Sequence, residues 1–211
     1  MRWEQDLSIL VFQFWSVEIH FYNKENVNQL SEGIQGIMSP TYRTKKLEKE
    51  LNHCHSTKNK INLADEYIRI GKYSEALELL NTCANDNSVD VKLIQAHYLN
   101  QNYQEVVSIS NSLKGHKSFE KSEEKICFAW SLFRTQNTQK AQEIFAEMDD
   151  KYCNYPQRIE YCKFLIETEQ KDFAESKLNR IRDEWDDMSR NEKRLYKGLD
   201  TEIRQLYKLL S

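Results

Sequence analysis

Apolar residues recur at three- and four-residue spacing from residue 59 to residue 81, with polar residues between them. The apolar positions are Ile61, Ala64, Tyr67, Ile68, Tyr73, Ala76, Leu77 and Leu80. This spacing places them on one side of two short amphipathic helices. Gly71 lies between the helices, where a residue that tolerates positive φ lets the chain reverse. The pattern therefore predicts a helical hairpin.

The same order of residues returns three more times along the chain. Its two anchor positions, Ala76 and Leu80 in the first hairpin, recur as Val106 and Ser110, Ala141 and Phe145, and Ala174 and Leu178. Successive anchors are 30, 35 and 33 residues apart, while Gly71 is replaced by Gln101, Gln136 and Glu169. Because Ser110 stands where the other hairpins have a large apolar residue, we expect the second hairpin to be the most loosely packed.

This pattern resembles the tetratricopeptide repeat (TPR), whose helical hairpins recur every 34 residues. The resemblance covers about four degenerate repeats, roughly residues 57 to 185. It implies an all-α fold, a right-handed TPR-like superhelical solenoid of antiparallel helix pairs with a C-terminal capping helix. An irregular helical bundle is the alternative interpretation.

The flanking sequence divides into further segments. The predicted organisation is an apolar N-terminal segment 1–22, a linker 23–39, a helix within 40–56 that begins at Ser39-Pro40, TPR-like repeats 57–188 and a capping helix 189–211. Ser189 and Glu192 form a capping-box pattern at the start of the last helix. We expect that helix to run from about 190 to 210 with Leu195, Leu199, Ile203, Leu206 and Leu210 on one side.

Residues 7–22 are the most apolar stretch, with 11 apolar residues in 16. A membrane-spanning helix needs about 20 mainly apolar residues, and this run is shorter and contains Gln13, Glu18 and His20. The favoured interpretation is a helix that packs on its own solenoid or on a second copy, which would make a homodimer. The alternatives are membrane contact through residues 7–22, and a strand or disorder.

Composition supports a helical protein of a reducing compartment. Only 5 Gly and 2 Pro leave little turn material, and 30% of the residues are charged. A net charge of −3 disfavours nucleic acid as a partner of the whole chain. Five scattered cysteines make a poor disulfide framework, and we expect a cytoplasmic protein without a cleaved secretory leader. The alternative location is membrane-associated, with the repeat domain in the cytoplasm.

Catalytic patterns are missing from the sequence. It contains no phosphate-binding glycine loop, G-x-S-x-G, H-E-x-x-H or C-x-x-C motif. His53, Cys54 and His55 are the densest group of metal-ligand residue types, but neighbours on a helix point about 100° apart and cannot all face one ion. We therefore expect no enzyme activity, no cofactor and no metal site.

The TPR resemblance implies that the first helix of each hairpin lines a concave groove that binds a protein or peptide. The groove positions are Ile61, Asp65, Ile68, Arg69, Val91, Gln95, Tyr98, Leu99, Ile126, Trp130, Phe133, Arg134, Ile159, Lys163 and Ile166. Their aromatic and aliphatic content suits an apolar helix or extended segment. The predicted function is a non-enzymatic protein-binding scaffold or adaptor, and the chain's own residues 7–22 are one candidate ligand. The alternative is a membrane-tethered TPR component of an envelope assembly, anchored through residues 7–22.

Overall fold

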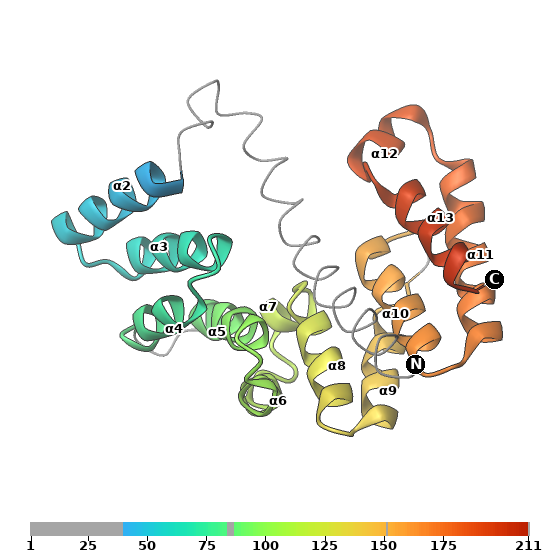
Figure 1. The fold of residues 1–211 in the computed structure, drawn as a ribbon, viewed down its shortest axis with the longest axis horizontal. Helices are drawn as coiled ribbons and strands as arrows, with labels where there is room; N and C mark the ends of the chain where they lie inside the picture. Colours follow the sequence, from blue (N-terminus) through green and yellow to red (C-terminus); the bar gives the residue numbers. More distant parts are fainter. Residues whose placement is uncertain (1–39, 84–86, 151, 211) are drawn as a thin grey trace, which may run out of the picture. The chain divides into compact units, whose positions relative to one another are not determined.

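The computed structural model describes residues 40–83, 87–150 and 152–210 (Figure 1). Every regular element in these ranges is a helix, and they contain no strand. The helices are α2 (Pro40–His53), α3 (Thr57–Arg69), α4 (Tyr73–Asn81), α5 (Asn87–Leu99), α6 (Tyr103–Ser112), α7 (Lys117–Glu120), α8 (Lys125–Arg134), α9 (Thr138–Glu147), α10 (Tyr155–Glu167), α11 (Lys171–Asp187), α12 (Arg190–Leu195) and α13 (Leu199–Leu210). The predicted all-helical fold is confirmed for these residues, while the predictions for 1–22 and 23–39 lie outside them.

The chain divides into two compact units, with the boundary between Asn102 and Tyr103. In the first unit, α3 and α4 pack as a pair, with α2 on α3 and α5 on α4. In the second unit, α8 pairs with α9 and α10 with α11, while α6 packs on α8. The second predicted hairpin is thus divided between the units, because α5 belongs to the first and α6 to the second. None of the described helices has the length and apolar character needed to cross a lipid bilayer.

Serine side chains cap the starts of two described helices. Ser56 precedes α3, and its hydroxyl accepts a hydrogen bond from the N–H of Asn59 at 3.2 Å. Before α12, the Ser189 hydroxyl accepts from the N–H of Glu192 at 3.3 Å, and the Glu192 carboxylate accepts from the N–H of Ser189 at 2.8 Å. The predicted capping box is therefore confirmed.

One turn geometry ends the first helix of all four predicted hairpins. The φ angles are 78° at Gly71, 62° at Gln101, 64° at Gln136 and 60° at Glu169. In each turn the next residue donates its N–H to the carbonyl five residues earlier, at 2.8 or 2.9 Å. This bond is the mark of a Schellman motif, which satisfies carbonyls at a helix end. The turns are therefore alike although only one of them contains glycine.

The anchor positions of the four hairpins are also alike in their burial. Ala76, Val106, Ala141 and Ala174 are all 0% exposed. The second anchors, Leu80, Ser110, Phe145 and Leu178, are all at most 1% exposed. The four segments therefore bury equivalent positions, including the one where Ser110 replaces a large apolar side chain.

The C-terminal helix is interrupted. The prediction of one helix from about 190 to 210 is wrong, because the chain turns between α12 and α13 at Gly198, which has a φ of 105°. Leu195 is consequently 79% exposed rather than part of the apolar side. Leu199, Ile203 and Leu206 are buried against α10 and α11, with Leu210 partly buried beside them. The second unit therefore ends in a helix that covers its last pair.

Candidate functional site

In the first unit, the predicted groove residues lie on α3 and α5. Ile68, Gln95, Tyr98 and Leu99 are buried, at 5–8% exposure, and are packed within the unit. The others, Ile61, Asp65, Arg69 and Val91, are partly exposed. Asp65 of α3 forms an ion pair of 3.1 Å with Lys92 of α5. Only the partly exposed residues present surface to a partner.

In the second unit, the predicted groove residues lie on α8 and α10. Ile126, Trp130 and Ile159 are at most 2% exposed. The other four, Phe133, Arg134, Lys163 and Ile166, are partly exposed. Since α8 and α10 contact each other, these four side chains come from neighbouring helices.

Trp130 belongs to the core rather than to an open surface. Its ring packs edge-on against Phe133, Phe145 and Phe164, with centroid distances of 5.5–6.1 Å. Its indole N–H donates to the Glu160 carboxylate at 2.9 Å. The other Glu160 oxygen accepts from the Lys163 ammonium at 2.7 Å. A buried indole N–H needs such an acceptor, and Glu160 supplies it.

A second charged pair, Arg134 of α8 and Glu167 of α10, lies at the C-terminal ends of these two helices. The Arg134 guanidinium donates to Glu167 at 3.1 Å and lies 5.5 Å from the Phe133 ring centroid. Burial raises the pKa of the Glu167 carboxyl, and the charge and hydrogen bond of Arg134 oppose that shift. The second Glu167 oxygen is buried and has no hydrogen-bond partner among the described residues.

These side chains form the surface that we call the α8–α10 face. It consists of Phe133 and Arg134 from α8 with Lys163, Ile166 and Glu167 from α10, and the buried Trp130 and Glu160 support it from beneath. It presents an apolar centre bordered by paired opposite charges, which is typical of protein-binding surfaces.

Sequence reasoning missed Glu160 and Glu167. Each follows a predicted groove residue, Ile159 or Ile166, and a carboxylate there is expected to face water. Two residues of α8 could have indicated these carboxylates. Trp130 needs a hydrogen-bond acceptor for its indole N–H when it is buried, and Arg134 favours a carboxylate partner.

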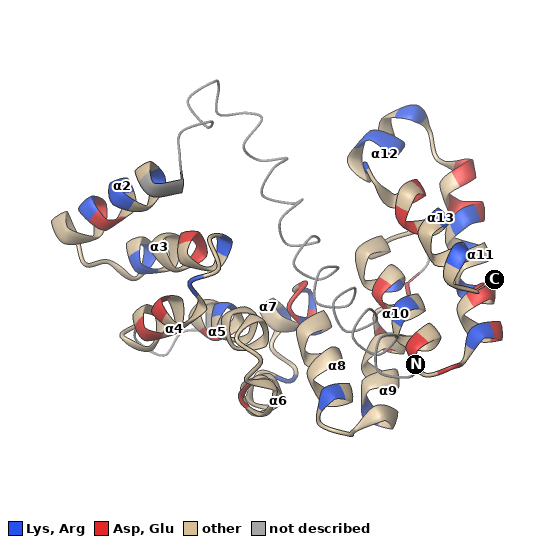
Figure 2. Cartoon of the chain, viewed as in Figure 1, with Lys and Arg blue, Asp and Glu red and all other residues tan. Residues whose placement is uncertain are grey.

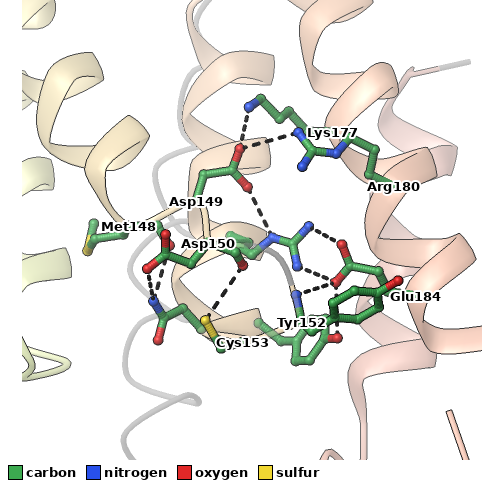
Figure 3. Close-up of polar contacts among 11 residues, drawn as sticks. Met148, Asp149, Asp150, Tyr152, Cys153, Lys177, Arg180 and Glu184 are labelled. Carbon is green, nitrogen blue, oxygen red and sulfur yellow. Dashed lines mark hydrogen bonds and ion pairs between the residues drawn. The ribbon is translucent and has the colours of Figure 1, made fainter.

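A separate charged cluster lies between α10 and α11 (Figure 3). Asp149 and Glu184, carried by the loop before α10 and by α11, both accept hydrogen bonds from Arg158. Asp149 also pairs with Lys177 and, at 4.0 Å, with Arg180. The network ties Asp149, which lies between α9 and α10, to both α10 and α11.

The described residues contain no group of three His, Cys, Asp or Glu side chains arranged to hold a metal ion. His53 ends α2, and Cys54 and His55 follow it, all three exposed. Cys127 and Cys162 are fully buried, and burial raises the pKa of both thiols, that of Cys162 to about 12. Both side chains therefore remain thiols and act as small apolar groups.

Comparison with known proteins identifies no relative. No family model matches the chain, and searches of curated proteins and of solved structures give no significant match. The case for a function therefore rests on the chain's own residues.

Proposed function

We propose that this chain is a non-enzymatic scaffold built of TPR-like helical hairpins, which binds an apolar helix or extended peptide of a partner protein. The observation that carries the proposal is the recurrence of one turn geometry at Gly71, Gln101, Gln136 and Glu169. These positions are separated by 30, 35 and 33 residues. A period near 34 residues with one helical hairpin per period is typical of the TPR family.

The α8–α10 face is the best-supported binding surface of the proposed scaffold. Phe133 and Ile166 supply partly exposed apolar area, and Arg134, Lys163, Glu160 and Glu167 supply charges that are already paired. A partner that buries this centre does not have to leave an uncompensated charge behind, which would be costly. The rigid aromatic packing behind Phe133 keeps the surface ordered before binding, and preorganisation of this kind favours affinity.

Selection from a displayed library of random peptides tests this proposal. We expect the full chain to enrich apolar peptides whose affinity falls about tenfold or more in Phe133→Ala, since buried aromatic anchors dominate such interfaces. Lys163→Ala serves as a second variant on the same face. Phe173→Ala is the matched control, because Phe173 of α11 is 66% exposed and lies outside the face.

Circular dichroism and thermal unfolding must first show that each variant is folded. The proposal fails if the selected peptides bind Phe133→Ala and Lys163→Ala as they bind the wild type. It also fails if binding is lost in Phe173→Ala, or if no peptide is enriched above an unrelated helical protein.

A further inference from the structure

The outward side of α2 carries a continuous stripe of exposed residues, most of them basic. The stripe consists of Tyr42, Lys45, Lys46, Lys49 and His53, and all five side chains are exposed. Their spacing of three, four, seven and eleven residues from Tyr42 confines them to an arc of roughly 100° on the helix. We call this surface the α2 stripe; Figure 2 shows the Lys and Arg positions of α2 in blue.

The opposite side of α2 fixes the orientation of the stripe. Thr44 is 8% exposed, and Leu47 and Leu51 are partly buried, so this side packs on α3. The Tyr67 hydroxyl donates to Glu48 at 3.1 Å, and Arg43 pairs with the buried Glu66 at 3.1 Å. These contacts leave the α2 stripe facing away from the unit that carries it.

The charge of the stripe is only weakly compensated. Lys46 is 4.0 Å from Glu50, with the Lys46 side chain 64% exposed, a distance and exposure at which an ion pair contributes little. Within the described part of the chain, Lys45 and Lys49 form no ion pair. Residues 43–60 contain six Lys or Arg and two Glu, although the whole chain has a net charge of −3. The positive charge is therefore concentrated at this end of the described chain.

We propose that the α2 stripe docks on an anionic lipid surface. Lysine is a compact and flexible point charge that suits the diffuse negative charge of a lipid headgroup layer, whereas base recognition favours arginine. Tyr42, 51% exposed at one end of the stripe, is of the type enriched at membrane–water interfaces. The apolar residues 7–22 precede α2 in the sequence, and stable attachment commonly combines an apolar element with a basic patch. This inference is independent of the proposed peptide binding.

Co-sedimentation of the full chain with vesicles tests the inference. One set of vesicles is phosphatidylcholine alone, and the other contains phosphatidylserine in addition. We expect binding to the phosphatidylserine vesicles to weaken on the order of a hundredfold in the triple variant Lys45→Gln, Lys46→Gln, Lys49→Gln, since each lysine near such a surface contributes about 1 kcal/mol. Raising the salt from about 0.1 M to about 1 M must weaken the binding as well, because the Debye length shortens from about 10 Å to about 3 Å.

The matched control is Lys140→Gln, Lys171→Gln, Lys197→Gln, which removes the same charge from exposed positions of the second unit. This control must bind as the wild type does. Equal binding to both kinds of vesicle, or no loss in the α2 triple variant, overturns the proposal and assigns any attachment to apolar residues. Tighter binding of a DNA or RNA duplex than of the anionic vesicles overturns it in favour of a nucleic-acid surface.

Discussion

Arg158 and Glu184 form a two-pronged buried ion pair. The two terminal guanidinium nitrogens of Arg158 lie 2.6 and 3.0 Å from the two Glu184 carboxylate oxygens. The side chains are 1% and 3% exposed. A buried pair of this kind contributes little net stability over an apolar pair, but removal of Glu184 leaves the buried Arg158 charge with Asp149 as its one remaining ion-pair partner among the described residues.

We therefore expect Glu184→Leu to lower the free energy of unfolding by about 3–5 kcal/mol. The double variant Arg158→Met, Glu184→Leu should cost less than the sum of the two single variants, because it removes both charges of the pair, and Asp149 keeps its ion pair with Lys177. The double-mutant cycle compares urea unfolding of the wild type, Arg158→Met, Glu184→Leu and the double variant. Additive costs would show that the two side chains are not coupled.

The carboxylate of Glu184 should also make the stability of the protein depend on pH. Burial alone would raise the pKa of Glu184, but hydrogen bonds from Arg158 and from the Tyr152 N–H lower it below its ordinary value of 4.5. Because the folded-state pKa is lowered, Glu184 stabilises the fold above about pH 4.5, and this contribution is lost as the pH falls toward the lowered value. We expect the stability gap between wild type and Glu184→Gln to narrow between pH 7 and pH 3. A gap that stays constant over this range would contradict the assignment.

Substitution by glycine should have opposite effects on stability at a Schellman turn and within a helix. Gln136 holds a φ of 64°, a conformation that costs a residue with a side chain roughly 1–2 kcal/mol. Gln136→Gly should therefore raise the free energy of unfolding by about 1 kcal/mol, as measured by urea unfolding. Ala146→Gly, at an exposed position of α9, should lower it by about 1 kcal/mol. A destabilising Gln136→Gly would mean that the Schellman turn is not formed.

Ser110 predicts a stabilising change in α6. Its side chain is fully buried, and its hydroxyl has no hydrogen-bond partner among the described residues. An unsatisfied buried hydroxyl costs about 1–3 kcal/mol, so Ser110→Ala should stabilise the protein by about 1 kcal/mol in thermal or urea unfolding. Ser108→Ala, at an exposed position of the same helix, measures the helix-propensity contribution alone. If the two variants are equally stable, the Ser110 hydroxyl is satisfied in solution.

Local periodicity was sufficient to predict the paired helices and the turn between α3 and α4, because each apolar side must be buried against a neighbour, but it did not predict the short helix α7. It was insufficient at Gly198, where the apolar period continues through the turn and only the glycine signals the break. Periodicity also cannot separate Phe133, which is partly exposed, from Trp130, which is 2% exposed, since both lie on the same helix side. Glu160 and Glu167 escaped prediction because the partners that make their positions favourable come from α8, about 30 residues away. The division at Asn102 has no local signal, since the α5–α6 segment carries the same repeat pattern as the others.

The C-terminal helix provides a last prediction. Leu206 of α13 is 2% exposed and belongs to a core shared with Tyr155, Ile159 and Leu178, whereas Leu209 of the same helix is 47% exposed. We expect Leu206→Ala to lower the free energy of unfolding by about 2–5 kcal/mol, because it removes apolar burial and leaves a cavity. Leu209→Ala should change it by less than about 0.5 kcal/mol, as surface substitutions commonly do. Hydrogen exchange at α10 and α11 should accelerate only in Leu206→Ala, since α13 covers this pair. If both variants behave alike, α13 does not act as the cap of the second unit, and its amphipathic side is available to another partner.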